Sequence, residues 1–510
     1  MTTRGVEGVM NIERASWHLS SDQGEEKERR AARKTEATIL NLVATVATLW
    51  LFGLVGCNGG GGSALVVRRP KPGPATNSSI IAVDCQRQRA YVPLLALNGS
   101  LHGQVAVLDL SIDPDQGDPT ITIIDIGLIA LPRSAAVDLE TGTVLVLADN
   151  VVDTGALLLI NEAGNTFTTI PLPAGSRPNE NSGVVVDPVN NRALVSMVDA
   201  STCTNVIPGV ASGGSTGTAV FDLASRTFGP LSLTLIDVDA FALDPTSSVS
   251  LGTSDPFLSE LLAFDLNSFG PVTCQLDDDN LKNLFADPDA TAVDPNTDVW
   301  VVGNFESPIA TVINLDGATF TGLGTMDCHL NEGGTPPNSV NFDTGTGADG
   351  MPGVAINPVT HQALMTADAG SQIALLSLPS KPTKQLKESK VSGVSSTIPK
   401  DPNGNDFTSA AFPYGTVTDS CHNLGYVVDD TRSFLAQIAL KKLGKNPSAI
   451  STALPPGTCA SIATSFQCDN GAGIKFYPIP SGLSGAAAGS LPARFSDEIH
   501  RQKKNAKSRR

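Results

Sequence analysis

One phrase recurs seven times along most of this chain, and this repetition limits the folds that the chain can adopt. An apolar run leads into an aspartate, a few polar residues follow, and a second apolar run begins, as in VVVDPVNNRALVSM around Asp187. Successive phrases are 49 to 63 residues apart. A period in this range indicates a repeat architecture, in which each unit packs against its neighbours. The residues in the motif position are Asp84, Asp138, Asp187, Asp244, Asp294, Asn357 and Asp419.

Each unit has the pattern of four short β-strands. An aspartate can bond backbone amides two residues further on, and a following proline presets φ, so the motif predicts a tight turn between two strands. A third apolar run follows in every unit, such as ALLLI at 156–160, and a weaker fourth run follows in most, such as 168–172. Four strands per unit are typical of a β-propeller blade.

The expected fold class is therefore all-β, a β-propeller of four-stranded blades over residues 64–480. Tandem β-sandwiches would need units of about twice this length, and a β-helix coil about half of it. Seven blades are expected, but 449–480 could either complete blade seven or supply part of an eighth. Because ring closure protects sheet edges, we expect Leu65–Val67 to pair with the last blade.

The motif V-A-V-D-P followed by a second apolar run resembles the YVTN and NHL families of propeller repeats. The resemblance covers about residues 79–480, and a terminal Tyr-Val pair occurs at Tyr91-Val92 and Tyr426-Val427. It implies a propeller fold and an extracytoplasmic location, and it implies no catalytic residue.

The N-terminal region carries a separate signal. Residues 1–36 are polar and are expected to be disordered, whereas 37–56 (ATILNLVATVATLWLFGLVG) contain no charged residue. Twenty such residues can span a bilayer, and the basic residues before them place that side in the cytoplasm. The sequence Leu54-Val55-Gly56-Cys57 resembles the lipobox of bacterial lipoproteins, which implies cleavage before Cys57 and lipidation of its sulfur.

These features predict a lipoprotein of the bacterial cell envelope that faces the periplasm or the cell surface. Residues 57–63, which include a glycine run, would form a flexible tether. The alternatives are an uncleaved transmembrane anchor and a chain released by ordinary signal cleavage. The basic segment 481–510 is expected to be a disordered tail.

Two disulfides are considered for an exported chain. Closure of a ring would bring Cys85 and Cys421 into neighbouring motif turns, but a bond requires Cα atoms within about 7 Å. Cys459 and Cys468 are close enough in sequence to bridge a local loop. Besides Cys57 there are seven cysteines, so at least one stays outside any intramolecular pair, and no CxxC pair supports a zinc ribbon.

Charge and loop length suggest where a partner would bind. The net charge of −17 argues against nucleic acid. The long segments 201–216, 277–290, 326–350 and 395–411 are predicted to join strands at the face opposite the motif turns, where they would form a loop-rich, acidic face. Carboxylates suit Ca²⁺, and the candidate ligands are Asp277, Asp278, Asp279, Asp401 and Asn403, although neither cluster fits an EF-hand.

The predicted function is a non-enzymatic binding or scaffold protein, with an unidentified protein or envelope ligand docking on the loop-rich face. We expect a monomer without a cofactor. The alternatives are an exported propeller enzyme of the hydrolase or lactonase type and a cation-dependent surface protein. No catalytic residue is assigned, although His329 and Asp327 in the longest loop are the candidates for an enzyme or metal site. His361 falls in a motif turn, where we expect it to be exposed.

Overall fold

The apolar runs of the repeat form β-strands in a computed structural model of this chain. Each first strand of a unit ends on its motif residue, because that side chain begins the turn. The structure describes residues 79–94, 102–112, 119–128, 130–150, 154–161, 166–173, 175–178, 182–199, 216–234, 238–254, 261–267, 274–276, 288–304, 309–314, 339–341, 353–367, 372–378, 392–397, 415–429, 434–440, 460–462, 465–467 and 474–479.

Seven four-stranded sheets follow one another through these residues, one for each repeat. The first two are β1 (Ala82–Asp84), β2 (Arg89–Leu94), β3 (His102–Asp109), β4 (Ile121–Leu128) and β5 (Ala130–Asp138), β6 (Thr143–Asn150), β7 (Thr154–Asn161), β8 (Thr166–Pro171). The third and fourth are β9 (Val184–Asp187), β10 (Arg192–Val198), β11 (Thr216–Asp222), β12 (Thr227–Thr234) and β13 (Val238–Asp244), β14 (Val249–Ser254), β15 (Leu261–Asp265), β16 (Cys274–Leu276).

The remaining three sheets are built in the same way. The fifth and sixth are β17 (Pro288–Asp294), β18 (Val299–Asn304), β19 (Ile309–Asn314), β20 (Ser339–Asn341) and β21 (Gly353–Asn357), β22 (Gln362–Ala367), β23 (Gln372–Ser377), β24 (Ser392–Thr397). The seventh is β25 (Thr416–Asp419), β26 (Leu424–Val428), β27 (Phe434–Ala439) and β30 (Ile474–Pro478). A separate hairpin, β28 (Ala460–Ile462) and β29 (Ser465–Gln467), precedes β30.

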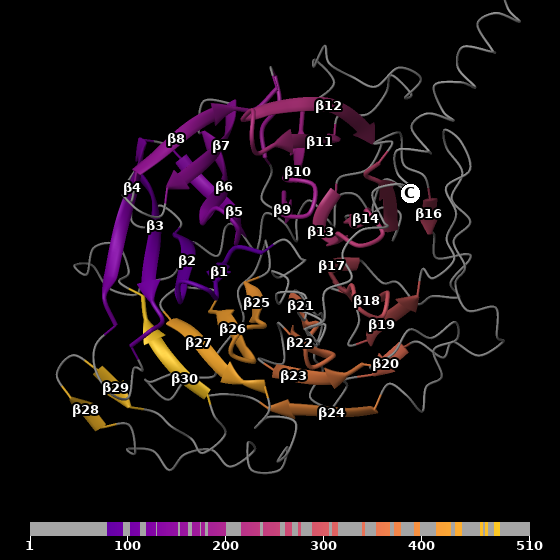
Figure 1. Cartoon of the computed structure of the whole chain (residues 1–510). Helices are drawn as coiled ribbons and strands as arrows, with labels where there is room; N and C mark the ends of the chain where they lie inside the picture. The colour runs from indigo at the N-terminus through magenta and orange to yellow at the C-terminus, as the bar shows by residue number, and fades with distance from the viewer. Residues whose placement is uncertain are drawn as a thin grey trace, which may run out of the picture. The chain divides into compact units, whose positions relative to one another are not determined.

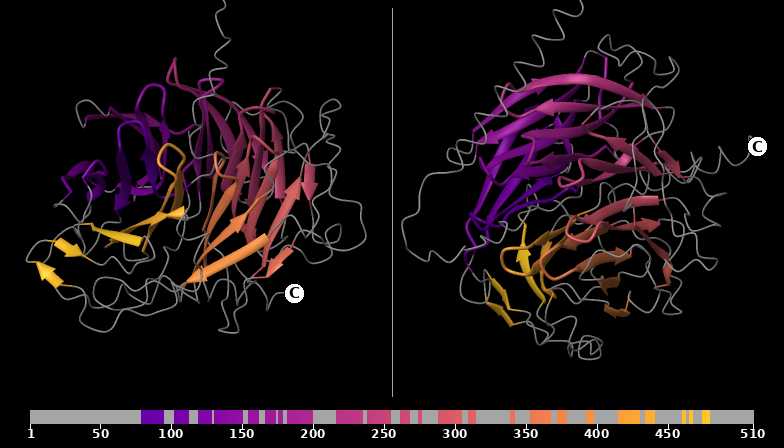
Figure 2. Two further views of the ribbon diagram at one scale, coloured as in Figure 1. Left: turned by 60° about the horizontal axis from the view of Figure 1, so that its bottom comes forward. Right: turned by 45° about the vertical axis from the view of Figure 1, so that its right-hand side comes forward.

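The seven sheets are the blades of a β-propeller, which confirms the predicted fold class and the count of seven. All strand pairs in them are antiparallel, and each blade runs outward from its first strand. Figure 1 shows β1, β5, β9, β13, β17, β21 and β25 nearest the centre, with β25 and β26 of blade 7 beside β1 and β2 of blade 1. The two views in Figure 2 show successive blades side by side around the ring.

Apolar packing between blades closes the ring. Val83 and Val92 of blade 1 share one buried cluster with Val417 and Leu435 of blade 7, and comparable clusters lie between the other neighbouring blades. A single blade leaves both faces of its sheet exposed, so the hydrophobic effect favours a neighbour on each side. The prediction that the first and seventh units meet is therefore confirmed.

The outer position of blade 7 is occupied by β30, which pairs with β27 along Ile474–Pro478. Residues 449–480 therefore complete the seventh blade and supply no four-stranded eighth blade within the described residues. Whether Leu65–Val67 also pair with the last blade stays a prediction. The fourth strand of the last blade comes from the C-terminal side of the chain, and 65–67 themselves lie outside the described residues.

The motif turns have one geometry in all seven blades. The motif residue always pairs with the residue five positions further on, as in Asp84 with Arg89 and Asp244 with Val249. The residue four positions on always has a positive φ, which lets the chain re-enter the sheet. These residues are Gln88, Gly142, Asn191, Ser248, Asp298, His361 and Asn423.

Strand order corrects one assignment of loops to faces. Because strands alternate in direction, the first-to-second and third-to-fourth connections leave from the end of the ring that carries the motif turns. β20 divides the segment 326–350, so the connection 315–338, between the third and fourth strands of blade 5, starts at the motif end. The connections 199–215, 277–287 and 398–414 start at the opposite end, as predicted.

The terminal regions 1–36, 37–56, 57–63 and 481–510 lie outside the described residues, so their predicted roles stay predictions. Within the part of the chain that the structure describes, no helix has the length and apolar character needed to cross a membrane.

Candidate functional site at the meeting of blades 1 and 7

The seven motif residues are buried and bonded within their own turns. Each is at most 2% exposed, and each side chain accepts a backbone N–H two or three residues on. In blade 4, for example, Asp244 Oδ1 accepts from Thr246 N at 2.8 Å and Oδ2 accepts from Ser247 Oγ at 2.7 Å. These groups hold the fold, as their repetition in the sequence predicted.

Polar contacts at the motif end also join neighbouring blades. Asn357 Nδ2 donates to Asn423 Oδ1 at 2.9 Å between blades 6 and 7. Asn296 Nδ2 donates to the carbonyl oxygen of Pro358 at 2.8 Å between blades 5 and 6. The side chain of Arg192 donates to the carbonyl of Leu266 between blades 3 and 4. At these three boundaries, turn residues therefore fix one blade relative to the next in addition to shaping their own turns.

A further polar link joins His361 of blade 6 to Asp294 of blade 5. His361 Nδ1 lies 2.6 Å from Asp294 Oδ2, and the exposed side-chain fractions are 20% and 0%. Burial raises the pKa of Asp294, and the hydrogen bond and charge of His361 oppose that shift. The expectation that His361 would be an exposed turn residue is wrong, because the turn directs it against the neighbouring blade.

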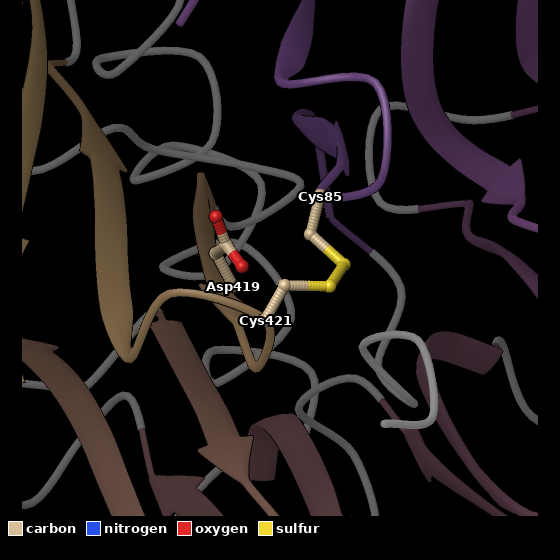
Figure 3. A group of neighbouring side chains, drawn as sticks. All are labelled: Cys85, Asp419 and Cys421. Atoms are coloured by element: carbon tan, nitrogen blue, oxygen red, sulfur yellow. A yellow bond between two sulfur atoms is a disulfide. The ribbon is translucent and has the colours of Figure 1, made fainter. Parts of the chain in front are cut away.

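A disulfide joins blade 1 to blade 7 in the structure. Cys85 follows the motif Asp84 by one residue, and Cys421 follows Asp419 by two, so both lie in motif turns. Their Cα atoms are 5.7 Å apart although 336 positions separate them in the sequence. Figure 3 shows the two cysteines reaching toward each other from the two turns, with Asp419 beside them.

Asp419 lies in a polar cluster that spans the same two blades. Gln88 Nε2 of blade 1 lies 3.1 Å from His422 Nε2 of blade 7, and an amide nitrogen can only donate. His422 therefore accepts at Nε2 and donates from Nδ1 to Asp419 Oδ2, at 2.8 Å. Burial first, and then the charge of Asp419, raises the pKa of the Tyr426 hydroxyl.

Three potential metal ligands meet at this position. One ligand atom each of Cys85, Asp419 and Cys421 lies within 4.8 Å of the other two. Cys85 and Asp419 are buried, whereas Cys421 is exposed. The disulfide occupies both sulfurs, so the oxidised protein offers only the carboxylate.

The other candidate residues from the sequence lie outside the described residues. They are Cys57, Asp277, Asp278, Asp279, Asp327, His329, Asp401, Asn403, Cys459 and Cys468. The hairpin β28–β29 pairs Ala460 with Gln467, the direct sequence neighbours of the last two cysteines. The lipidation, cation-binding and second-disulfide hypotheses therefore stay predictions.

Sequence reasoning missed the contacts of the two histidines. His361 and His422 both follow a motif residue by three or four positions, a spacing that the repeat alignment displays. That spacing places each side chain near a buried carboxyl, but it does not predict whether the carboxyl belongs to the same blade or to the neighbouring one. His422 bonds the carboxylate of its own turn, whereas His361 bonds the carboxylate of the neighbouring blade.

Comparison with known proteins adds little beyond the fold. No known protein family matches the sequence, and no curated protein matches it significantly. Among solved structures, a mitotic checkpoint complex chain is 9% identical with a TM-score of 0.42 over 74% of this chain and 94% of that chain. Sqt1 of Saccharomyces cerevisiae is 10% identical with a TM-score of 0.43, covering 72% and 83%.

A protein from Lactobacillus plantarum is 12% identical with a TM-score of 0.43, covering 69% of this chain and 91% of that one. Likeness at this level carries no argument about function. The class of protein is defined by the chain's own strand pairing: it is a seven-bladed β-propeller whose first and last blades are joined by a disulfide.

Proposed function

We propose that this chain is a non-enzymatic binding or scaffold propeller, anchored by a lipid in the bacterial cell envelope, with its partner on the loop-rich face. The observation that carries the binding role is a structural difference between the two ends of the ring. At the motif end, the seven motif side chains are buried and hydrogen-bonded within their turns. The long connections 199–215, 277–287 and 398–414 start at the other end.

Variable connections on a rigid scaffold are where proteins commonly carry binding function. The motif turns, by contrast, are identical in length in all seven blades. The acidic residues of 277–287 favour a basic or cationic group on the partner. A YVTN- or NHL-like ancestry, inferred from the repeat phrase, agrees with an exported surface protein.

The binding role is tested by replacing one connection at a time. We would replace 278–286 by a glycine-serine linker of equal length and cross-link intact cells of the source organism. The expected result is loss of the cross-linked partner with an unchanged melting temperature. The matched control is an equal-length replacement within 319–334, which starts at the motif end and should leave the cross-link intact. Equal loss in both variants would contradict the proposal.

The anchoring role is tested at the mature N-terminus. Mass spectrometry should find a lipid-modified Cys57 as the first residue, and Cys57→Ser should abolish the modification. An intact peptide that spans residues 50–60 in the purified protein would rule out lipobox cleavage. If the purified propeller hydrolysed lactones and His329→Ala abolished this activity, the alternative of an exported enzyme would replace the binding role.

A further inference from the structure

We propose that the cluster of Cys85, Cys421 and Asp419 is a redox-gated binding site for a thiophilic divalent cation such as Zn²⁺. In the oxidised protein the disulfide joins blades 1 and 7. In the reduced protein the two thiolates and the carboxylate hold the cation, which then joins the same two blades.

The ligand types suit this chemistry. Zn²⁺ is bound by cysteine thiolates, histidine nitrogens and aspartate oxygens, usually with four ligands in a tetrahedron. Two thiolates and one carboxylate would supply three positions, and a water molecule can take the fourth. Soft thiolate ligands favour Zn²⁺ over Ca²⁺ or Mg²⁺, which prefer oxygen.

The distances suit both states. The Cα separation of 5.7 Å lies in the range of a disulfide. With Zn–S bonds of about 2.3 Å, tetrahedral geometry requires the two sulfurs to be about 3.7 Å apart. Rotation about the Cα–Cβ bonds can provide this separation once the S–S bond is broken. The carboxylate is already within 4.8 Å of both sulfur atoms.

The surroundings hold the carboxylate in place and leave a route for the ion. His422 Nδ1 donates to Asp419 Oδ2, and Gln88 Nε2 fixes the far side of the same imidazole ring. Such outer hydrogen bonds orient ligands and raise metal affinity. Cys421 is exposed, so the ion and a reductant can approach from the motif end of the ring.

The step balances with a dithiol as the reductant. The dithiol forms its own disulfide as it breaks the Cys85–Cys421 bond, which transfers two electrons and two protons and leaves two thiols. Zn²⁺ then displaces the two thiol protons to solvent as both sulfurs become ligands. An oxidising dithiol–disulfide couple reverses the sequence and releases the ion.

The repeat itself provides a matched pair of variants. Asp419 and Asp187 occupy the same motif position and are both buried, but the motif turn of blade 3 (DPVNNR) holds no cysteine. Blade 6 has Asn357 in this position, so the turn accepts an amide. Asp419→Asn should therefore fold and keep the disulfide, while it loses one proposed ligand. Asp187→Asn makes the same change away from the cysteines.

The test titrates the full-length protein with Co²⁺ and Zn²⁺ after reduction by a phosphine. The reduced protein should show a thiolate-to-cobalt charge-transfer band that Zn²⁺ displaces, and oxidation should remove the part of this band that depends on Cys85 and Cys421. Because other cysteines can contribute, the relevant quantity is the difference from the Cys85→Ser/Cys421→Ser variant. Asp419→Asn should bind at least about tenfold more weakly than the wild type, and Asp187→Asn should bind as the wild type does.

Three results would overturn the site. One is a charge-transfer band of equal strength in the double serine variant. Another is equal Zn²⁺ affinity in Asp419→Asn and Asp187→Asn. The third is absence of binding by the reduced wild type when its circular dichroism shows a folded β-protein. Stability provides a second readout, since a cation that binds only the folded state raises the melting temperature of the reduced wild type.

Discussion

The Cα atoms of Cys85 and Cys421 lie 5.7 Å apart, one in the first motif turn of the ring and the other in the last. Every other pair of neighbouring blades is joined by a continuous chain segment, but blades 1 and 7 are not. The bond therefore lies at the one boundary of the ring where the backbone provides no connection, and it adds to the apolar cluster shared by Val83 and Val417.

Removing this bond should destabilise the propeller. Cys85→Ser/Cys421→Ser should lower the free energy of unfolding by about 2–5 kcal/mol, chiefly because the unfolded chain regains the freedom of a very long loop. Urea unfolding of the full chain, with a chelator and without reductant, measures the effect. As a control, adding reductant should weaken the wild type more than the double variant. Equal stability of the two oxidised proteins would contradict this prediction.

Asp294→Asn should change how stability depends on pH. Burial raises the pKa of Asp294 above that in the unfolded chain, so the folded state binds more protons between the two pKa values and the wild type loses stability as pH rises. The amide variant lacks this titration. Its stability relative to the wild type should therefore increase between about pH 4 and pH 7. Urea unfolding across that range provides the comparison, and a flat or falling difference would refute the assignment.

The positive-φ position of the motif turn, four residues after the motif residue, offers a pair of opposite substitutions. Ser248 has a φ of 58°, and Gly142 has a φ of 74° at the equivalent position of another blade. A side chain at positive φ is strained, whereas glycine is not but is more flexible when unfolded. Ser248→Gly should stabilise by about 0.5–1 kcal/mol, and Gly142→Ala should destabilise by about 1 kcal/mol. Thermal melting measures both, and effects of the same sign would contradict the shared turn geometry.

The motif carboxylate should matter more as an acceptor than as a charge. Asp244→Ala leaves the N–H of Thr246 and the hydroxyl of Ser247 without their acceptor. We expect a loss of about 1–3 kcal/mol for this variant. Asp244→Asn keeps an oxygen for the backbone N–H, and its cost should be less than half as large. The two free energies of unfolding, measured in urea, decide the point, since equal costs would show that the charge itself is required.

The repeat phrase by itself predicted the propeller, seven repeat units and the form of the motif turn, while it left open whether residues 449–480 complete the seventh blade. These properties depend on contacts between residues close in sequence: Asp244 bonds atoms two and three residues away, and the apolar runs on either side pair directly. Such contacts repeat wherever the phrase repeats, so a one-dimensional pattern predicts them. The structural role of the seven motif side chains was predictable for the same reason.

Tertiary structure alone decided what happens between blades. His361 bonds Asp294 of the preceding blade, while His422 bonds Asp419 of its own turn, and spacing in the sequence does not separate these outcomes. The identity of the last outer strand, β30, was also decided by which segment pairs with β27 in the folded chain. The distance between Cys85 and Cys421 is likewise a product of ring closure. It depends on how seven twisted sheets pack around one axis, because side-chain fit between blades, rather than any local pattern, sets the position of each turn against the next.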